Sequence, residues 1–105
     1  MPDLSANPTL KDFQKYAQEL ENERGFSDQD VLQKCLMLGE EVGELFKVVR
    51  KRTNIKIDPN SKVGEAGEEL TDVFIFLLAI ANRLDVDLEQ AFRDKEEKNK
   101  TRVWK

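Results

Sequence analysis

The sequence predicts an all-α fold, and three observations lead to that prediction. Apolar residues recur at helical spacing, turn and capping signals divide the chain into four segments, and no segment shows the alternation typical of strands. Hydrophobic residues make up 39% and charged residues 36% of the 105 residues, a balance common in helix-rich globular proteins. We expect a single domain over residues 1–105, with residues 1–8 as a flexible lead-in.

The first helix is expected to begin after Thr9, a residue type that caps helix N-termini. Its apolar residues follow the spacing of one helical face: Leu10, Phe13, Tyr16, Ala17 and Leu20. The helix is expected to run to about Asn22, because Gly25 supplies a stop signal soon after it.

The second helix is the longest that the sequence predicts. Ser27, followed by Asp30 three positions later, resembles a capping box, and from that cap a helix can run to about Arg52, roughly 26 residues or about 39 Å. Its apolar stripe consists of Val31, Cys35, Leu38, Val42, Leu45 and Val49. We expect this stripe to face the core.

Two further helices follow a loop. The stretch TNIKIDPNSK, residues 53–62, contains the turn signal Asp-Pro-Asn-Ser and is predicted to be the main loop. A third helix is expected to start within residues 61–64 and to end near Leu84. Asp87 then caps a fourth helix, which is expected to end near Asn99. Together the four segments predict a four-helix bundle.

The third helix carries nine consecutive apolar residues, VFIFLLAIA at positions 73–81. A helix that is apolar on every side has to be buried on every side, whereas a lone four-helix chain leaves the outer side of each helix in water. We therefore expect homo-oligomerisation to complete the bundle, as a homodimer or a dimer-of-dimers tetramer. The alternative is burial under the chain's own first helix and tail.

Composition narrows the chemistry that the chain can perform. Histidine is absent, which excludes Ser-His and Cys-His nucleophiles, two-histidine zinc sites and Glu-x-x-His di-iron sites. Cys35 is the single cysteine, so a reducing compartment is expected. A net charge of −4 argues against a nucleic-acid polymer as the partner. The sequence has neither an export signal nor a membrane-length apolar run, so we expect a cytoplasmic protein without a membrane partner.

Carboxylates gather at the edge of the predicted core. Glu41 and Glu44 are neighbours on one flank of the second helix, and Glu69 repeats the i, i+3 spacing with Asp72 on the third. If these helices pack antiparallel, the four groups converge, and like charges about 5 Å apart repel by about 3 kcal/mol at an effective dielectric constant of 20. A cation would relieve that repulsion, and oxygen-only ligands suit Mg²⁺ or Mn²⁺. The alternative is that each acidic pair lies on a solvated face.

The acidic residues form two ordered blocks. Glu40-Glu41-Val42-Gly43-Glu44 is followed, after 24 residues, by Glu69-Leu70-Thr71-Asp72. This E-E-x-x-E and E-x-x-D arrangement resembles the pattern of the MazG-type, all-α nucleoside triphosphate pyrophosphohydrolases. The stretches KCLMLGEEVGELFKVVRK, GEELTDVFIFLLAIANRL and KEEKNKTRVW are also similar to family members. The likeness covers roughly residues 10–104.

The resemblance implies a fold, an activity and a set of ligands. The family fold is a helical bundle that forms dimers or tetramers, and its enzymes cleave a nucleoside triphosphate, here expected to be a deoxynucleotide, into a monophosphate and pyrophosphate. The implied Mg²⁺ ligands are Glu41, Glu44, Glu69 and Asp72. Glu40 and Glu41 are the catalytic candidates, with Glu40 supporting the ligands or activating a water. A role in clearing surplus or non-standard nucleotides is implied as well.

Cations for the triphosphate are expected on the last helix and the tail, in a position similar to the family's basic C-terminal element. The candidate substrate-binding residues are Lys95, Lys98, Asn99 and Arg102. Their spacing allows one helical face to meet the phosphates. The alternative is that lysines at this end only interact favourably with the helix dipole. Lys47 and Lys51 are weaker candidates for the same role.

The base needs an aromatic or apolar platform. The candidates are Phe13, Tyr16, Phe26 and Trp104, of which the first two suit the core better. Family members often have a tryptophan after the first helix, where this chain has Phe26, and this departure leaves the base preference open.

Two rival hypotheses compete with the resemblance. The stretch EEVG is similar to the end of the Nudix hydrolase motif, but Leu36 and Met37 stand where that motif needs Arg-Glu, and no strands surround it. The rival from another class is a non-catalytic helical protein that dimerises through the third helix and binds a basic partner with its acidic face. That hypothesis predicts no dependence on a metal.

Overall fold

The computed structural model describes residues 2–103, and within that range it contains four helices and no strand. The helices are α1 (Leu10–Arg24), α2 (Val31–Arg52), α3 (Ala66–Arg83) and α4 (Leu88–Lys100). The all-α prediction is therefore confirmed, and each of the four predicted helices is present. No helix among the described residues is long and apolar enough to cross a membrane.

Two of the predicted N-caps are confirmed. The Thr9 hydroxyl accepts a hydrogen bond from the Asp12 backbone N–H at 3.1 Å, and the Asp12 carboxylate accepts one from the Thr9 N–H at 2.9 Å, which completes a capping box. Asp87 accepts from the backbone N–H of Gln90 at the start of α4. Gly25 follows α1 with a φ of 77°, in the left-handed region that glycine adopts without strain.

The predicted cap of α2 is wrong. The Ser27 hydroxyl donates a hydrogen bond to the side-chain oxygen of Asn22 instead, which ties the loop back to the end of α1. Asp30 is the N-cap, and it forms a reciprocal capping box with Gln33, each bond being 2.8 Å. The helix therefore begins at Val31, three residues later than a Ser27 cap implies, and a short loop separates α1 from α2.

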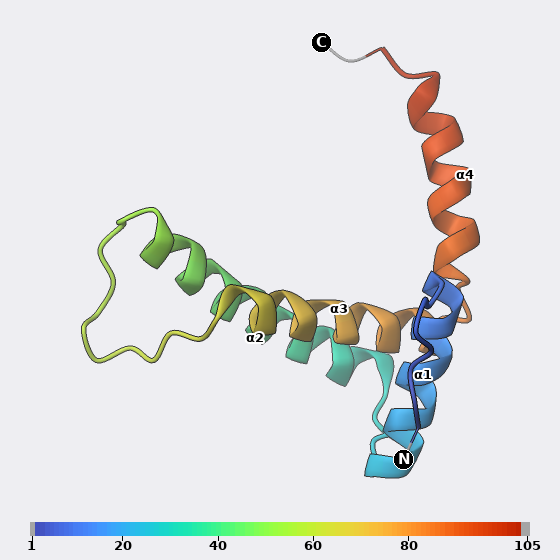
Figure 1. Cartoon of the computed structure of the whole chain (residues 1–105), viewed down its shortest axis with the longest axis horizontal. Coiled ribbons are helices and arrows are strands. Elements are labelled where there is room, and N and C mark those ends of the chain that lie inside the picture. Colours follow the sequence, from blue (N-terminus) through green and yellow to red (C-terminus); the bar gives the residue numbers. More distant parts are fainter. Residues whose placement is uncertain (1, 104–105) are drawn as a thin grey trace.

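The helices form an open arrangement in the single chain. α2 and α3 lie side by side and antiparallel, α1 packs against α3, and α4 packs against α1 and projects away from the α2–α3 pair (Figure 1). The radius of gyration is 16.5 Å, whereas a compact chain of this length has one of about 13 Å. The accessible surface is 8205 Å², against about 6,000 Å² for a compact monomer of this mass. A single chain therefore does not close a bundle.

The core of the single chain is correspondingly thin. The buried apolar side chains among the described residues are Ala17, Val48, Leu78, Ala79 and Ala81. Within the apolar run of α3, Ile75 and Leu77 remain 36% and 45% exposed. The helix that is apolar on every side is thus covered on part of its circumference only.

The face of α2 that packs on α3 differs from the predicted stripe. Cys35 is exposed and Val49 is 50% exposed, whereas Lys34 and Val48 are only 3% exposed. Lys34, Glu41 and Val48 are spaced by seven residues, about two helical turns, and so lie on one side of the helix. That side faces inward because Lys34 finds a carboxylate and two aromatic rings there, which the spacing of apolar residues does not reveal.

A polar junction fixes where α1, α3 and α4 meet. The buried Gln14 side chain donates to Asn82 Oδ1 at 3.1 Å and to the Val86 carbonyl at 2.8 Å, and its oxygen accepts from the Leu88 N–H at 2.8 Å. Asn82 returns a hydrogen bond of 2.9 Å to the Gln14 carbonyl. Every polar group of this amide is therefore paired, and the turn that carries α4 away from α3 is held in one geometry.

Candidate metal and nucleotide site

Three carboxylates from α2 and α3 meet in one place. Glu41 on α2 and Glu69 with Asp72 on α3 each offer an oxygen, and the three oxygens lie within 4.8 Å of one another. The i, i+3 spacing puts Glu69 and Asp72 on one face of α3, and the antiparallel packing brings Glu41 opposite them. We call these three residues the acidic cluster.

The acidic cluster concentrates negative charge. Burial raises the pKa of the Glu41 carboxyl, and the negative charges of Asp72, Glu69 and Glu44 raise this pKa further. Two ionised carboxylates 4.8 Å apart repel by about 3.5 kcal/mol at an effective dielectric constant of 20 and by about 0.9 kcal/mol in water. A bound cation would remove this repulsion.

The donor set fits a hard divalent cation. Three half-buried carboxylates offer oxygen ligands only, with neither histidine nor thiolate in the cluster. Mg²⁺ and Mn²⁺ favour such ligands, and Mg²⁺ commonly keeps water or phosphate oxygens in its remaining positions. The cluster therefore suits an ion that is shared with a phosphate chain.

The other two predicted acids stand apart from the cluster. Glu44 makes an ion pair with Lys47 on its own helix, at 3.4 Å between Nζ and Oε1. It still acts on the cluster electrostatically, since its charge contributes to the raised pKa of Glu41. The Glu40 side chain is exposed.

Gly64 supports the cluster from outside the predicted set. A Cβ atom built on Gly64 would stand 2.3 Å from Glu69 Oε1, so the glutamate carboxylate occupies the space that a side chain would need. The segment beside it stays non-helical, and α3 begins at Ala66, later than the predicted range of 61–64. The sequence alone did not single out Gly64, because its close approach to Glu69 depends on tertiary geometry.

A cavity lined by aromatic rings lies next to the cluster. Its volume is about 190 Å³, and Asp72 forms part of its wall. Phe26 from the α1–α2 loop and Phe76 from α3 line it, together with Lys34 and Ile75. We call it the aromatic cavity.

Residues 29–104 match the MazG nucleotide pyrophosphohydrolase domain. The chain belongs to the MazG family. The matched residues include α2, α3 and α4 and therefore both acidic blocks.

Relatives with named activities include dCTP pyrophosphatase 1 of mouse and of human. Each is 33% identical to this MazG chain over 104 residues. The alignments cover 94% of this chain and 61% of the relatives, so the chain spans about three fifths of the length of these curated relatives.

Solved structures show the same fold. YPJD from Bacillus subtilis, a protein provisionally assigned as a pyrophosphatase, is 29% identical with a TM-score of 0.80, over 94% of this chain and 100% of that one. iMazG from Vibrio DAT 722 is also 29% identical, with a TM-score of 0.70 over 92% and 99% of the two chains. The MazG-like all-α fold is therefore confirmed.

The side chains predicted to bind the phosphates do not lie at the acidic cluster of this chain. The candidates on α4 and after it are the cations Lys95, Lys98 and Arg102 and the neutral donor Asn99. α4 packs on α1 and projects away from the α2–α3 pair (Figure 1). Asn99 donates to Glu96 on its own helix at 3.2 Å. Lys47 is the candidate that lies beside an acid of the motif.

The aromatic residues predicted as platforms for the base also lie in different parts of the structure. Phe13 packs edge-to-face on Phe74 with ring centres 5.4 Å apart, and Tyr16 is half-buried outside the aromatic cavity. Phe26 lines that cavity. Trp104 lies outside the described residues.

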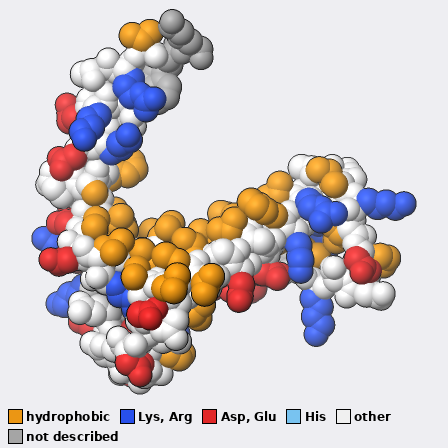
Figure 2. All heavy atoms as spheres, turned by 180° about the vertical axis from the view of Figure 1, so that it is seen from behind, with side chains coloured by type: hydrophobic (Ala, Val, Ile, Leu, Met, Phe, Trp, Pro, Cys, Tyr) orange, Lys and Arg blue, Asp and Glu red, His pale blue; other side chains and the backbone are white. Residues whose placement is uncertain are grey.

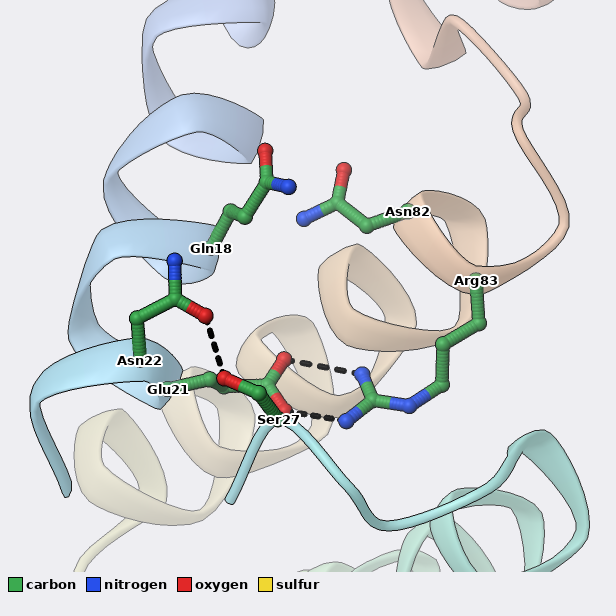
Figure 3. Close-up of a pocket in the computed structure, with 6 residues that line it drawn as sticks. All are labelled: Gln18, Glu21, Asn22, Ser27, Asn82 and Arg83. Carbon is green, nitrogen blue, oxygen red and sulfur yellow. Dashed lines mark hydrogen bonds and ion pairs between the residues drawn. The ribbon is translucent and has the colours of Figure 1, made fainter. Parts of the chain in front are cut away.

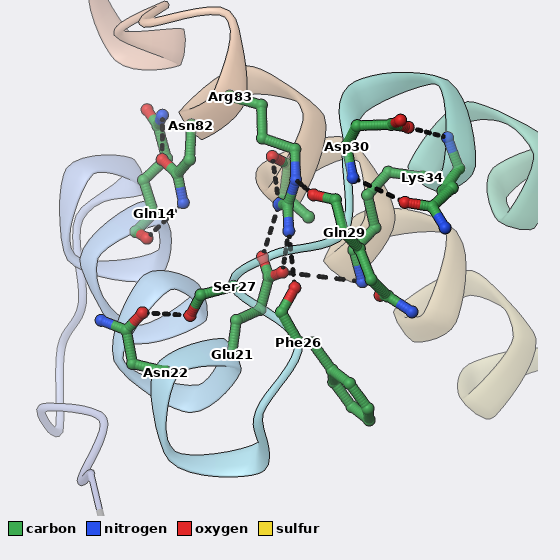
Figure 4. Close-up of polar contacts among 12 residues, drawn as sticks. Gln14, Glu21, Asn22, Phe26, Ser27, Gln29, Asp30, Lys34, Asn82 and Arg83 are labelled. Atoms are coloured by element: carbon green, nitrogen blue, oxygen red, sulfur yellow. Dashed lines mark hydrogen bonds and ion pairs between the residues drawn. The ribbon is translucent and has the colours of Figure 1, made fainter.

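The sequence did not predict a network of charged groups at the wall of the aromatic cavity. Arg83 donates two parallel hydrogen bonds, of 2.9 and 2.5 Å, to the carboxylate of Glu21 (Figure 4). It also donates to the carbonyls of Ala79 at 3.0 Å, Phe26 at 3.0 Å and Gln29 at 2.7 Å. The α1–α2 loop is thereby fixed to α3, and the Phe26 ring is held at the cavity.

Proposed function

We propose that the protein is a Mg²⁺-dependent nucleoside triphosphate pyrophosphohydrolase, with Mn²⁺ as a possible substitute. The observation that supports this most is the meeting of Glu41, Glu69 and Asp72 beside the aromatic cavity. Water would attack one of the two phosphorus atoms joined by the α–β bridging oxygen, and the P–O bond from that atom to the bridge would break, so that a nucleoside monophosphate and pyrophosphate leave. The dCTP pyrophosphatase relatives favour a deoxynucleotide as substrate. A role in clearing surplus or non-standard nucleotides is part of the same proposal. A cytoplasmic location belongs to the same proposal.

We infer the following roles for the acidic residues from their positions. Glu41, Glu69 and Asp72 hold the cation, and Glu44 joins them when its ion pair with Lys47 opens. When bound, the cation neutralises phosphate charge and supplies Lewis-acid assistance to the hydrolysis. Glu40, exposed next to Glu41, accepts a proton from the attacking water or supports the ligands.

We also propose that a second copy of the chain completes the site. Apolar side chains of α3, α4 and the turn between them line a cavity of about 430 Å³; they include Phe74, Leu77, Leu84, Leu88 and Phe92. Figure 2 shows hydrophobic side chains along this concave side. A helix pair from a second copy would cover them, in a homodimer or a dimer-of-dimers tetramer, and so reduce the excess of accessible surface. In such an assembly the partner's α4 could bring its cations to the phosphates.

The proposal is tested by incubating the protein with Mg²⁺ and a panel of deoxynucleoside and ribonucleoside triphosphates. We expect equal amounts of monophosphate and pyrophosphate from at least one of them. Glu41→Gln should lose this activity and keep its helical content. Glu68→Gln is the matched control, because Glu68 is an exposed acid in the first turn of α3 outside the cluster. If the wild-type protein turns over none of the nucleotides, the non-catalytic interaction protein becomes the better hypothesis.

A further inference from the structure

Lys34 is a buried lysine that the proposed chemistry leaves without a role. It is 3% exposed, at the start of α2, and it lines the aromatic cavity. Its ammonium lies 5.3 Å from the centre of the Phe26 ring and 5.5 Å from that of the Phe76 ring. A lysine is almost never buried to this extent unless its charge has partners.

The partner of Lys34 is already engaged elsewhere. The Lys34 ammonium lies 3.6 Å from Glu21 Oε2, which is an ion pair and longer than an ordinary hydrogen bond. Both oxygens of Glu21 accept shorter hydrogen bonds from Arg83, at 2.9 and 2.5 Å (Figure 4). An ammonium has three protons to donate, so Lys34 retains donor capacity.

The position of Lys34 relates the cavity to the acidic cluster. Lys34 and Glu41 are seven residues apart on one side of α2, a separation of about 10.5 Å along the helix. The cavity includes Asp72 of the cluster as well as Lys34. A nucleotide with its phosphates at the cluster would therefore extend its base into the aromatic cavity, beside Phe26 and Phe76, and present the far edge of that base to Lys34.

The neighbouring pocket offers no comparable site. It has a volume of about 120 Å³ and lies on the other side of Glu21 and Arg83, where Ser27 pairs with Asn22 and Arg83 pairs with Glu21 (Figure 3). Its ionised groups are thus committed to each other. Most of the side chains that share the cavity with Lys34 are apolar or aromatic; the charged ones are Glu21, which is paired with Arg83, the exposed Arg24, and Asp72 of the acidic cluster. In such surroundings a donor is selective because an unmatched partner is costly.

We propose that Lys34 determines base specificity by donating a hydrogen bond to an exocyclic oxygen on the far edge of the base. This inference rests on the proposed function and deepens it. Uracil and thymine carry such an oxygen at position 4, and guanine carries one at position 6. Cytosine and adenine carry an amino group there, which is a hydrogen-bond donor and would face the Lys34 ammonium, another donor. The chain should therefore favour oxo bases over the cytosine for which its dCTP pyrophosphatase relatives are named.

The test measures binding of the product monophosphates, so that it does not depend on turnover. Isothermal titration of the full-length protein with dUMP and dCMP in Mg²⁺ should give at least tenfold tighter binding of dUMP, a difference of about 1.4 kcal/mol. Lys34→Met should bring the two affinities within about twofold. Equal affinities in the wild type, failure of both to bind, or an unchanged preference in Lys34→Met would each overturn the inference.

Two controls separate the role of Lys34 from general effects. Arg24→Met removes the other cation that lines the cavity, at the exposed end of α1, and should keep the preference for dUMP. If Lys34→Met fails to fold, the wild type is titrated with the monophosphate of the pyrimidin-2-one deoxynucleoside, which carries hydrogen at position 4. That ligand should bind more weakly than dUMP, and equal binding would overturn the inference. Absence of triphosphate hydrolysis with the dUMP preference intact would instead count against the proposed function alone.

Discussion

Glu41 of α2 and Asp72 of α3 place carboxylate oxygens within 4.8 Å of each other, although 31 positions separate them in the sequence. Glu69 contributes the third oxygen, and burial, followed by the concentration of negative charge, raises the pKa of Glu41. Such an arrangement is unfavourable in the absence of a cation and favourable in its presence. Several of the properties expected of this protein follow from that difference.

The stabilisation by Mg²⁺ or Mn²⁺ should depend on pH. Because the pKa of Glu41 is raised in the folded state, ionising this group opposes folding, and the metal-free protein should lose stability as the pH rises above the ordinary carboxyl value of 4.5. The cation needs the ionised form, so the rise in Tm on adding it should be small near pH 4.5 and larger at pH 7. Melting curves with and without MnCl₂, at matched ionic strength, measure this. A rise in Tm of the same size at both pH values would contradict it.

Removing one charge should stabilise the metal-free protein. Glu41→Gln in the presence of a chelator should raise the Tm by about 4 °C, which corresponds to about 1 kcal/mol in a domain of this size. The same variant should gain less from Mn²⁺ than the wild type does. Glu68→Gln should melt like the wild type under both conditions, and a lower Tm for Glu41→Gln than for the control would be inconsistent with repulsion in the cluster.

The substitution Gly64→Ala should weaken metal binding without unfolding the protein. The added Cβ would stand 2.3 Å from Glu69 Oε1, so the flexible carboxylate has to move. We expect at least a tenfold rise in the Mn²⁺ dissociation constant, measured by titration calorimetry, with unchanged helical content. Gly67→Ala is the matched control, since no atom lies within 4 Å of a Cβ at that position. Equal affinities in the two variants would mean that Glu69 does not need its present position.

Loss of Arg83 should destabilise the fold through Glu21. Arg83→Met leaves this buried carboxylate with the longer Lys34 contact alone. It also removes the hydrogen bonds to three carbonyls of the loop and of α3. The free energy of unfolding, measured in urea at pH 7, should fall by about 3 kcal/mol. Burial alone would raise the pKa of Glu21, but the hydrogen bonds and charge of Arg83, with Lys34, outweigh it and lower that pKa. The contribution of the pair is therefore present above pH 4.5 and is lost below it, so the difference from wild type should shrink in acid.

A surface ion pair supplies the control for that experiment. Lys11 and Asp87 are 3.8 Å apart with side chains 75% and 44% exposed. Lys11→Met should change the unfolding free energy by less than about 0.5 kcal/mol. A comparable loss in both variants would show that burial of the Arg83 pair is not what matters.

Disrupting the concave apolar side should reduce the size of the assembly. Leu77 and Leu84 are 45% and 57% exposed in the single chain and both line the cavity between α3 and α4. Their joint replacement by aspartate should shift sedimentation toward the monomer and lower the Tm. Leu4→Asp, at an exposed residue outside that cavity, should leave the assembly unchanged. A monomeric wild-type protein would contradict the proposed homo-oligomer.

Local signals in the sequence predicted most of the fold. Thr9 and Asp87 could be predicted as caps because a cap bonds to a backbone N–H only three residues away. The meeting of Glu41 with Glu69 and Asp72 could be predicted from helical spacing together with antiparallel packing. The Ser27 cap was wrong because its hydroxyl bonds to Asn22 in the preceding helix. Serine and aspartate both cap helices readily, so local preference alone does not show that Asp30, three residues after Ser27, is the N-cap.

Interactions between distant segments escaped prediction for a common reason. Lys34 and Glu21 look like ordinary surface charges in the sequence, and their burial depends on Arg83, which is 62 positions beyond Glu21. The close approach of Glu69 to Gly64 depends in the same way on the path of the loop. Such contacts form only when distant segments pack together, so local sequence patterns do not reveal them. They lie in the regions that orient the candidate site.

The most direct test of the acidic site is a calorimetric titration of Mn²⁺ into the wild-type protein, Asp72→Asn and Glu68→Gln. We expect the wild type and Glu68→Gln to bind the ion with the same affinity and Asp72→Asn to bind it at least tenfold more weakly, a loss of about 1.4 kcal/mol. Undiminished binding by a correctly folded Asp72→Asn variant would contradict the claim that the carboxylates of α2 and α3 hold the cation together.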